Sequence, residues 1–511
     1  MKGNDAGAAA WNGTGPEPPG GTLAGGAASN LEALSERRGA MALTQLKSAL
    51  LRRPAPVQIQ SVPGRIRVIT SITVAALILL FAALMITTVS ARQGLRLIGH
   101  EAGPQVVATA NLYFTLSDMD AQVAGVLLMG RDYAVQRQQA LQRYEQRRTQ
   151  AGRALLQSFE LAGDDPLEQR TIQAVLDGLG RYDRLAGQAL LLSADAKYPA
   201  GAPPQRVLRV YRAATDLMER EVLPQAYNLT LENGTIVRGA HDQERSAVLA
   251  GRGVVIVAGV IALGCLVWLQ VFLARRFRRL FNPALLLVSA VTAMYTFTGV
   301  SVLGKETNAL LTAKRDGFDS VLTLAKARAI SNNMHADQTR HLLDPVRADT
   351  YAQVYFEKSQ SLFYVAADNL GGYYDKVTAA AAAYPREKGF LGLLGDESRR
   401  PAGSAETAAM RDMAAAYARF QQADGRLRAL STEDGRAAAA VAVRLGPLST
   451  EYERYDAGLV ELTKRRLAVF ERSVGNGEDA LADLWFLLPA AMISITVLVI
   501  AGVRPRLNEY R

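Results

Sequence analysis

The chain has 511 residues, of which 49% are hydrophobic, and its formal net charge is +10. This composition suits a protein with both membrane-spanning segments and water-soluble helices. Nucleic acid is disfavoured as a partner because the arginines gather beside long apolar runs, as at the flanks of membrane spans, and not in a basic stripe interleaved with aromatic residues. The single cysteine, Cys265, excludes a disulfide within the chain.

The N-terminal part lacks the apolar residues that a core needs. Residues 1–28 are rich in Gly, Ala and Pro, so we expect a disordered tail. Residues 29–65 begin with a capping-box pattern at Ser29 and Glu32 and continue as a basic amphipathic segment. This segment is either a juxtamembrane helix, solvated or lying on the membrane surface, or a docking helix for a cytoplasmic partner. A cleavable signal peptide is disfavoured because the first apolar run begins so far from the N-terminus.

Four apolar runs are each long enough to cross a hydrocarbon core of roughly 30 Å. A short loop between the second and third runs carries four arginines, which are too costly to bury in a bilayer and mark the cytoplasmic face. Both termini are then cytoplasmic, in a plasma (inner) membrane protein. The arginines, our partner-contact candidates, are Arg275, Arg276, Arg278 and Arg279.

This topology divides the chain into ten segments. They are the tail 1–28, the basic segment 29–65, transmembrane helix 66–90, extracytoplasmic bundle 91–251, transmembrane helix 252–274, arginine-rich loop 275–283, transmembrane helix 284–303, extracytoplasmic bundle 304–483, transmembrane helix 484–503 and cytoplasmic tail 504–511.

The segment 91–251 has the helical periodicity of a four-helix bundle. A heptad seam continues from the first span to Gly130 and is broken only at Gln105. Further helices are expected over about 132–161, from Pro166 to about residue 194, and from about residue 205 into the second span. In this last helix we expect kinks at Pro224 and at Asn233-Gly234. Short turns between the helices favour an up-down-up-down arrangement.

The segment 304–483 repeats this plan. Its helices are expected to run from the third span to about residue 343, over 348–384, near 406–430, and from a cap at Ser431 into the fourth span. The seam of the last helix slips at Arg466, which alters a supercoil without ending the helix. A weak match between the halves at an offset of 215 supports a tandem duplication. The predicted fold is an all-α membrane protein with four transmembrane helices and two tandem extracytoplasmic four-helix bundles.

No pattern in the sequence is typical of an enzyme. Phosphate-binding, nucleophile-elbow, zinc-protease and dinucleotide motifs are absent, so we expect no catalytic residue, cofactor or metal. The four histidines are scattered, and His335 and His341 are spaced so that they fall on different faces of a helix. The spans lack Asp, Glu, Lys, Arg and His, which disfavours a transporter or channel.

Two groups of side chains have a functional and a structural interpretation. Asp118, Asp120 and Asp337 are either ammonium-binding groups or, more commonly, solvated helix-surface charges. Paired aromatics either line a ligand pocket or fill the bundle core, and the core is the usual outcome; they are Tyr355, Phe356, Phe363, Tyr364, Tyr373 and Tyr374. Asn228 and Asn233 fit a glycosylation triplet that occurs often by chance.

The stretch from Leu112 to Ala121, followed by Gly130-Arg131-Asp132, resembles the first helix and turn of the four-helix-bundle sensor domains of bacterial chemoreceptors and sensor kinases. The resemblance covers residues 66–280. Those receptors place a HAMP module and an output domain after the second span. Here about ten residues separate the second and third runs and eight follow the fourth, too few for a kinase, methyl-accepting region or cyclase.

The overall plan over about 65–511 resembles GlnX-like four-span membrane sensor proteins of actinobacteria. That resemblance implies two helical ectodomains that link an amino-acid-binding lipoprotein outside to a cytosolic Ser/Thr kinase, and it brings no ligand residues. The leading hypothesis is a non-enzymatic signal sensor, which as a bundle protein also allows a homodimer. The alternatives are a structural envelope scaffold and an accessory subunit of a transporter.

Overall fold

A computed structural model describes residues 62–96, 99–100, 103–163, 165–277 and 282–508. These residues form helices and no strand, with one isolated bridge between Tyr364 and Leu391. The expected disordered tail and nearly all of the expected basic segment lie outside the described residues. Ile69–Arg511 form one compact unit, to which the packing below refers.

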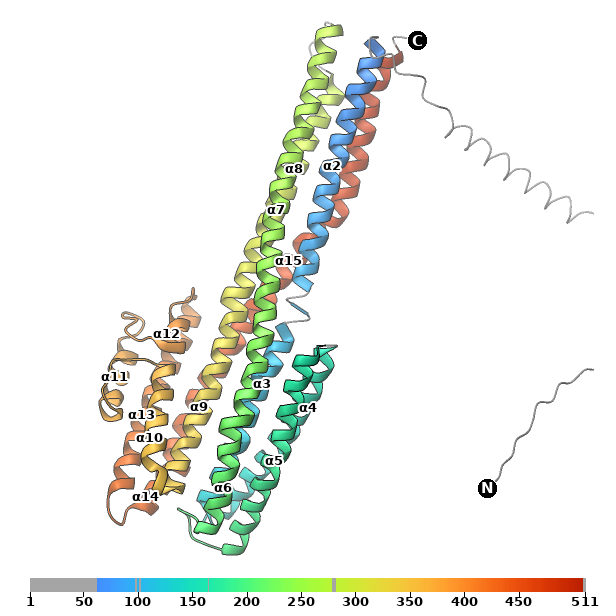
Figure 1. Ribbon diagram of the computed structural model, residues 1–511. Helices are drawn as coiled ribbons and strands as arrows, with labels where there is room; N and C mark the ends of the chain where they lie inside the picture. The colour runs from blue at the N-terminus through green and yellow to red at the C-terminus, as the bar shows by residue number, and fades with distance from the viewer. Residues whose placement is uncertain (1–61, 97–98, 101–102, 164, 278–281, 509–511) are drawn as a thin grey trace, which may run out of the picture. The chain divides into compact units, whose positions relative to one another are not determined.

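The first half of the chain consists of long helices whose ends fall close to the expected positions (Figure 1). They are α2 (Val62–Arg96), α3 (Gly103–Met129), α4 (Ala134–Ala162), α5 (Pro166–Ala196), α6 (Gln205–Leu217) and α7 (Leu223–Phe277), with the π-helical stretch η2 (Met218–Val222) between the last two. Asp165 caps α5 by accepting hydrogen bonds from the backbone N–H groups of Leu167 and Glu168.

The second half has the same long elements and several shorter ones. They are α8 (Pro283–Thr312), the π-helical stretch η3 (Ala313–Phe318), α9 (Asp319–Leu343), the 3-10 turn η4 (Pro345–Arg347), α10 (Ala348–Leu362), α11 (Leu370–Ala383), α12 (Gly392–Ser398), α13 (Ser404–Thr432), α14 (Ala437–Val443), the π-helical stretch η5 (Arg444–Leu448) and α15 (Ser449–Asn508).

The single helix expected over 348–384 is wrong, because the chain breaks it into α10 and α11. The Tyr373 hydroxyl donates to the carbonyls of Ser359 and Phe363, and the Tyr364–Leu391 bridge holds the connecting segment in extended form. Asn369 then caps α11 through the backbone N–H of Gly372. These tertiary contacts outweigh the local helical pattern.

Other boundaries also differ from expectation. The expected cap Ser431 lies inside α13, where its hydroxyl donates to the Arg428 carbonyl, and the next helix begins at Ala437. The expected loop 385–404 contains α12. Helix α7 shows no break at Asn233-Gly234, and the region before Pro224 takes the π-helical form of η2. Helix α15 continues through Arg466, as expected for a seam slip.

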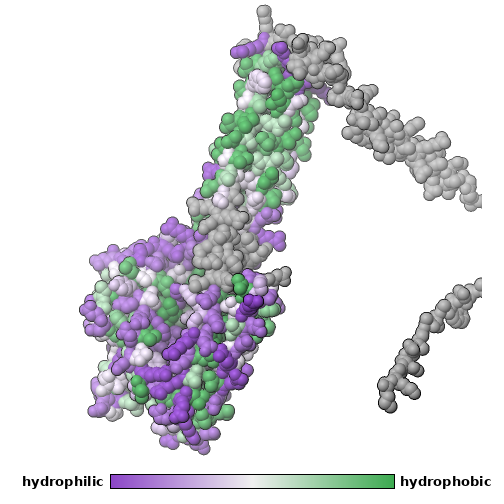
Figure 2. Space-filling view, viewed as in Figure 1, coloured by the Kyte–Doolittle hydropathy of each residue, from purple (hydrophilic) through white to green (hydrophobic). Residues whose placement is uncertain are grey.

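Four helical segments are long and apolar enough to cross a membrane, which supports a multi-pass membrane protein. They are Gly64–Arg96, Val248–Arg275, Pro283–Leu343 and Ala437–Arg504. In Figure 2 apolar residues gather on the narrow column, whereas the broad part is mostly hydrophilic. Close helix contacts occur at small residues, because a Cβ on Gly259 of α7 would lie 2.4 Å from Thr296 Cγ2 of α8, and one on Gly299 of α8 would lie 2.4 Å from Leu84 Cδ2 of α2.

Two large apolar cores, one in each half of the chain, are separate from the core among the candidate spans. They are not fully separate from each other, since Leu343 and Val441 of the second half belong to the core of the first. Helix α3 packs along α4 and also along α9, so it stands between the two sets of helices. The polar side chains that α3 and α9 direct at one another are therefore removed from water.

Candidate functional site

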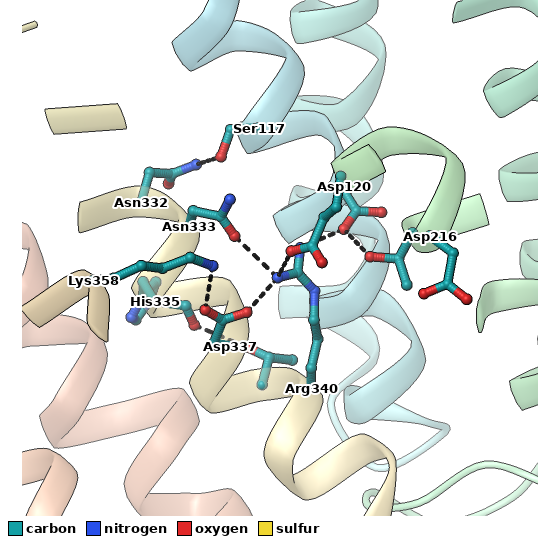
Figure 3. Close-up of polar contacts among 12 residues, drawn as sticks. Ser117, Asp120, Asp216, Asn332, Asn333, His335, Asp337, Arg340 and Lys358 are labelled. Atoms are coloured by element: carbon teal, nitrogen blue, oxygen red, sulfur yellow. Dashed lines mark hydrogen bonds and ion pairs between the residues drawn. The ribbon is translucent and has the colours of Figure 1, made fainter. Parts of the chain in front are cut away.

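A buried cluster of charges lies where α3 and α9 meet (Figure 3). Its centre is the guanidinium of Arg340 on α9, whose side chain is only 2% exposed. Asp120 of α3 and Asp337 of α9 are each 1% exposed. A charge buried this deeply is tolerated only when it is paired and hydrogen-bonded.

Arg340 bonds to residues from three separate parts of the chain. Its Nη2 donates to Asp120 Oδ2 at 2.6 Å, and its Nη1 donates to Asp337 Oδ1 at 2.5 Å. The same Nη1 also donates to Asn333 Oδ1 at 3.0 Å and to Glu219 Oε1 of η2 at 2.7 Å. One side chain thus joins α3, α9 and the π-helical stretch of the first half.

Asp120 is also held by hydrogen bonds within the first half. Its Oδ2 accepts a hydrogen bond from Thr215 Oγ1 at 2.7 Å, and its Oδ1 accepts one from the Tyr182 hydroxyl at 3.0 Å. Asp337 is likewise held by the second half, since Lys358 of α10 donates to its Oδ2 at 2.6 Å. The cluster therefore links α5 and α6 on one side to α10 on the other.

The cluster holds two cations, Arg340 and Lys358, against three carboxylates. Burial is the main cause that raises the pKa of Glu219, opposed by the nearby Arg340 charge. Burial also raises the pKa of the Tyr182 hydroxyl well above its ordinary value, with Asp120 as the next cause. Tyr182 therefore stays a neutral donor to Asp120.

Two ion pairs beside this cluster also cross between the halves. Arg212 of α6 holds Asp344, with Nε 2.7 Å from Oδ2 and Nη2 2.5 Å from Oδ1. In the opposite direction, Arg347 of η4 contacts Asp216 of α6 at 3.1 Å. Bidentate guanidinium–carboxylate pairs fix orientation as well as distance. Together these pairs set the register of α6 against the end of α9.

The expectation that Asp118, Asp120 and Asp337 are solvated surface charges is wrong. All three are buried, and Asp118 accepts a hydrogen bond from Arg147 Nε at 2.6 Å. Their cationic partners come from the protein itself. Sequence reasoning missed Arg340, although its place three residues after Asp337 is the spacing of an ion pair along a helix.

The paired aromatics mostly fill the core of the second half. Tyr355, Phe363 and Tyr373 are fully buried there, while Tyr364 is 44% exposed. The rings of Phe363 and Phe390 stack with centroids 3.9 Å apart. The core interpretation is confirmed for the three buried rings.

The histidines that the structure describes have structural partners. His335 stacks on Tyr452, with ring centroids 4.1 Å apart, and its Nδ1 bonds to Gln338. His341 bonds to Ser431 and to the Ala348 carbonyl. Within the described ranges, no group of three or more His, Cys, Asp or Glu side chains is placed to hold a metal ion.

The structure describes only part of the arginine-rich loop. Arg275 is exposed near the end of α7, and Arg276 lies in the same helix, whereas Arg278 and Arg279 lie outside the described residues. Asn282 caps α8, and its Nδ2 donates to the Gly502 carbonyl of α15 at 2.9 Å. The N-terminal end of the third span is thereby attached to the C-terminal end of the fourth.

Comparison with known proteins gives one family match. Residues 94–242 match the family described as the actinobacterial sensor domain. A search of curated proteins found no match, and a search of solved structures found none. The matched region holds Asp120, Tyr182, Thr215 and Glu219, which form the first-half side of the charge cluster. The sensor-domain match and the four candidate spans together support an actinobacterial membrane sensor.

Proposed function

We propose that this protein is a non-enzymatic transmembrane signal transducer. It couples an extracytoplasmic ligand, or a solute-binding lipoprotein loaded with one, to a cytosolic partner such as a Ser/Thr kinase. The observation that carries the proposal is continuity: the sensor-domain match ends at residue 242 inside α7, and the same helix continues into the candidate span Val248–Arg275.

An uninterrupted helix gives such a protein its means of transmission. Each turn of α7 and α15 is held by backbone hydrogen bonds, so a slide or rotation at one end moves the other. Helix shifts of about 1–2 Å are common in switching proteins. The 60 residues of α15 extend from the second bundle to the end of the fourth span. Each half therefore has at least one continuous helix that, in this proposal, enters the membrane.

The charge cluster makes the two halves respond together in this proposal. Arg340 bonds to Asp120 of the sensor-matched half and to Asp337 of the other half. Both carboxylates are buried, so water does not take the place of Arg340 if these bonds break. A ligand-driven shift of α3 relative to α9 breaks or remakes these bonds as a set. Buried contacts of this kind favour discrete arrangements over gradual deformation.

Topology is the first test. With Cys265 replaced by Ala, the variants Ser404→Cys and Arg275→Cys each carry one thiol. A membrane-impermeant maleimide added to intact cells is expected to label Ser404→Cys and to reach Arg275→Cys only after permeabilisation. The opposite pattern contradicts the proposal that 91–251 and 304–483 are extracytoplasmic and that the 275–283 loop and both termini are cytoplasmic.

The output is tested by pull-down from membranes of the native host. We expect neutralisation of Arg275, Arg276, Arg278 and Arg279 to Gln to abolish recovery of a cytosolic regulator. A matched control loses the same charge from exposed arginines elsewhere, namely Arg411, Arg426, Arg436 and Arg454. Recovery of no cytosolic regulator by wild type or control contradicts the proposal and favours the scaffold. Stable recovery of a transporter instead favours the accessory subunit.

A further inference from the structure

A cavity of about 370 Å³ lies beside the turn that joins α3 to α4. The end of α5 forms its opposite wall. It is separate from the charge cluster and belongs to the region that matches the sensor domain. Its lining residues are Gly130, Arg131, Ala134, Arg137, Gln138, Leu141, Ser193, Ala194 and Lys197.

The charge of the lining has one sign. Three of the lining residues, Arg131, Arg137 and Lys197, are cationic, and none is Asp or Glu. Arg131 has one carboxylate nearby, since its Nε lies 3.6 Å from Asp132 Oδ1. Both side chains are about half exposed or more. Such an exposed contact neutralises little of the charge.

Arg137, one of the lining residues, is partly exposed and has one unmet hydrogen-bonding group. Its Nε is buried and has no hydrogen-bond partner among the residues that the structure describes. A buried guanidinium N–H without an acceptor costs free energy that an incoming acceptor restores. The fork of the guanidinium matches the two oxygens of a carboxylate.

The cavity rim is fixed before any ligand arrives. Gly130 has a φ of 51°, and the backbone N–H of Arg131 donates to the Tyr198 carbonyl at 3.0 Å. The backbone N–H of Gly201 donates to the Leu128 carbonyl at 2.8 Å. Beneath the rim, the Tyr198 hydroxyl donates to the Leu127 carbonyl at 2.6 Å. A site held in this way requires little ordering on binding.

We propose that this cavity binds a small organic anion of the carboxylate class. Arg137 supplies the paired N–H donors, and Lys197 and Arg131 supply further positive charge. Gln138 offers a neutral hydrogen bond, and Leu141 with the two alanines accepts a short hydrocarbon part. The volume lies at the small end of the usual range of about 300–1,000 Å³ for ligand pockets.

This inference rests on the proposed sensing function and names its ligand class. A bound carboxylate contacts α4 through Arg137 and the end of α5 through Lys197, next to the final residue of α3. Asp120 lies on α3 ten residues before Gly130, which is roughly 15 Å along a helix. Binding therefore acts on the helix that carries one half of the charge cluster.

The test uses purified full-length protein at constant ionic strength, titrated by calorimetry. The probes are acetate, succinate and citrate, with succinamide as the uncharged match and with inorganic phosphate and sulfate as other anions. We expect saturable binding of at least one carboxylate and none of succinamide. Arg137→Gln is expected to weaken that binding at least tenfold. Arg143→Gln, on an exposed part of the same helix, is expected to leave it unchanged.

Three outcomes overturn the inference: no carboxylate binds, phosphate and sulfate bind as tightly as any carboxylate, or Arg137→Gln binds as tightly as wild type. The melting temperature of Arg137→Gln, compared with that of Arg143→Gln, separates lost binding from lost folding. If Arg137→Gln does not fold, Lys197→Gln takes its place with the same expected loss. Binding without recovery of a cytosolic regulator supports the site and contradicts the proposed function, and the reverse result contradicts the site alone.

Discussion

Arg340 Nη2 lies 2.6 Å from Asp120 Oδ2, joining two buried side chains that are 220 positions apart in the sequence. This contact connects the sensor-matched half of the chain to the other half. Because both groups are almost fully removed from water, neither tolerates loss of its partner.

Replacement of Arg340 by Met is expected to destabilise the protein by about 3–5 kcal/mol, since it leaves the carboxylates of Asp120 and Asp337 buried with less compensation. The measurement is denaturant unfolding of the full chain. Arg148→Met is the control, because Arg148 is 52% exposed in its pair with Asp183, and a change of at most about 1 kcal/mol is expected. Adding Asp120→Asn to Arg340→Met should cost less than the sum of the single changes. A loss below about 1 kcal/mol for Arg340→Met contradicts the assignment.

The turn at the cavity rim requires glycine. At Gly130 φ is positive, and a Cβ would lie 2.6 Å from the carbonyl oxygens of Tyr198 and Pro199. We expect Gly130→Ala to destabilise the protein by about 1–3 kcal/mol and to weaken carboxylate binding as the rim shifts. Gly152→Ala, in α4, is the comparison: a Cβ there meets nothing within 4 Å, and a gain of up to about 1 kcal/mol is expected. Equal melting temperatures for the two variants would refute this reading.

A second close approach lies between η3 and α15. A Cβ on Gly317 would lie 2.8 Å from Phe470 Cα and 3.0 Å from its backbone N, so α15 has to move to admit it. Gly317→Ala is expected to lower stability by about 1–3 kcal/mol. Gly475→Ala on α15 meets nothing within 4 Å and should be neutral or slightly stabilising. Thermal unfolding of both variants distinguishes packing from backbone propensity.

Acid is expected to destabilise the second half. Burial and then the Arg444 charge hold the pKa of His335 well below its usual value, and burial and then Arg428 lower the pKa of His341. The folded state therefore keeps these rings neutral while the unfolded state takes up protons below about pH 6.5. Because the unfolded state binds more protons, stability is complete above that pH and falls by up to about 1.4 kcal/mol per pH unit for each ring below it.

Unfolding measured between pH 7 and pH 5 checks this. His335→Gln should reduce the slope of unfolding free energy against pH by the contribution of one proton, up to about 1.4 kcal/mol per pH unit. His100→Gln is the control, because the His100 side chain is 59% exposed. An unchanged slope in His335→Gln, with the protein still folded at pH 7, would show that His335 is not the group that titrates.

Much of the fold was predictable because helix periodicity and turn residues are local signals. The ends of α4 and α5 follow from Gly163, Pro166 and the period of their apolar residues, and they fall within two residues of the expected positions. The break between α10 and α11 was not predictable in the same way. It depends on the Tyr373 hydroxyl reaching Ser359 and Phe363, a contact that only the packed structure creates.

The candidate site was predictable only in its parts. The residues Asp120 and Asp337 stand out in the sequence as charges on the first helix of each predicted bundle, but their burial depends on α3 packing along α9. Sequence spacing places Arg340 beside Asp337, whereas nothing local relates it to Asp120. Pairing over so long a separation is a property of the tertiary fold.

The π-helical stretch η3 divides one long helix into two parts with different rotational phase. A π turn accommodates one residue more than the normal winding, and each residue of a regular helix advances the facing direction by about 100°. Helices α8 and α9, on either side of η3, therefore take their orientations from separate neighbours. Migration of the wide turn along the chain would rotate the residues it passes while leaving both ends in place. Deletion of a single residue within Ala313–Phe318 would remove the wide turn and with it this freedom.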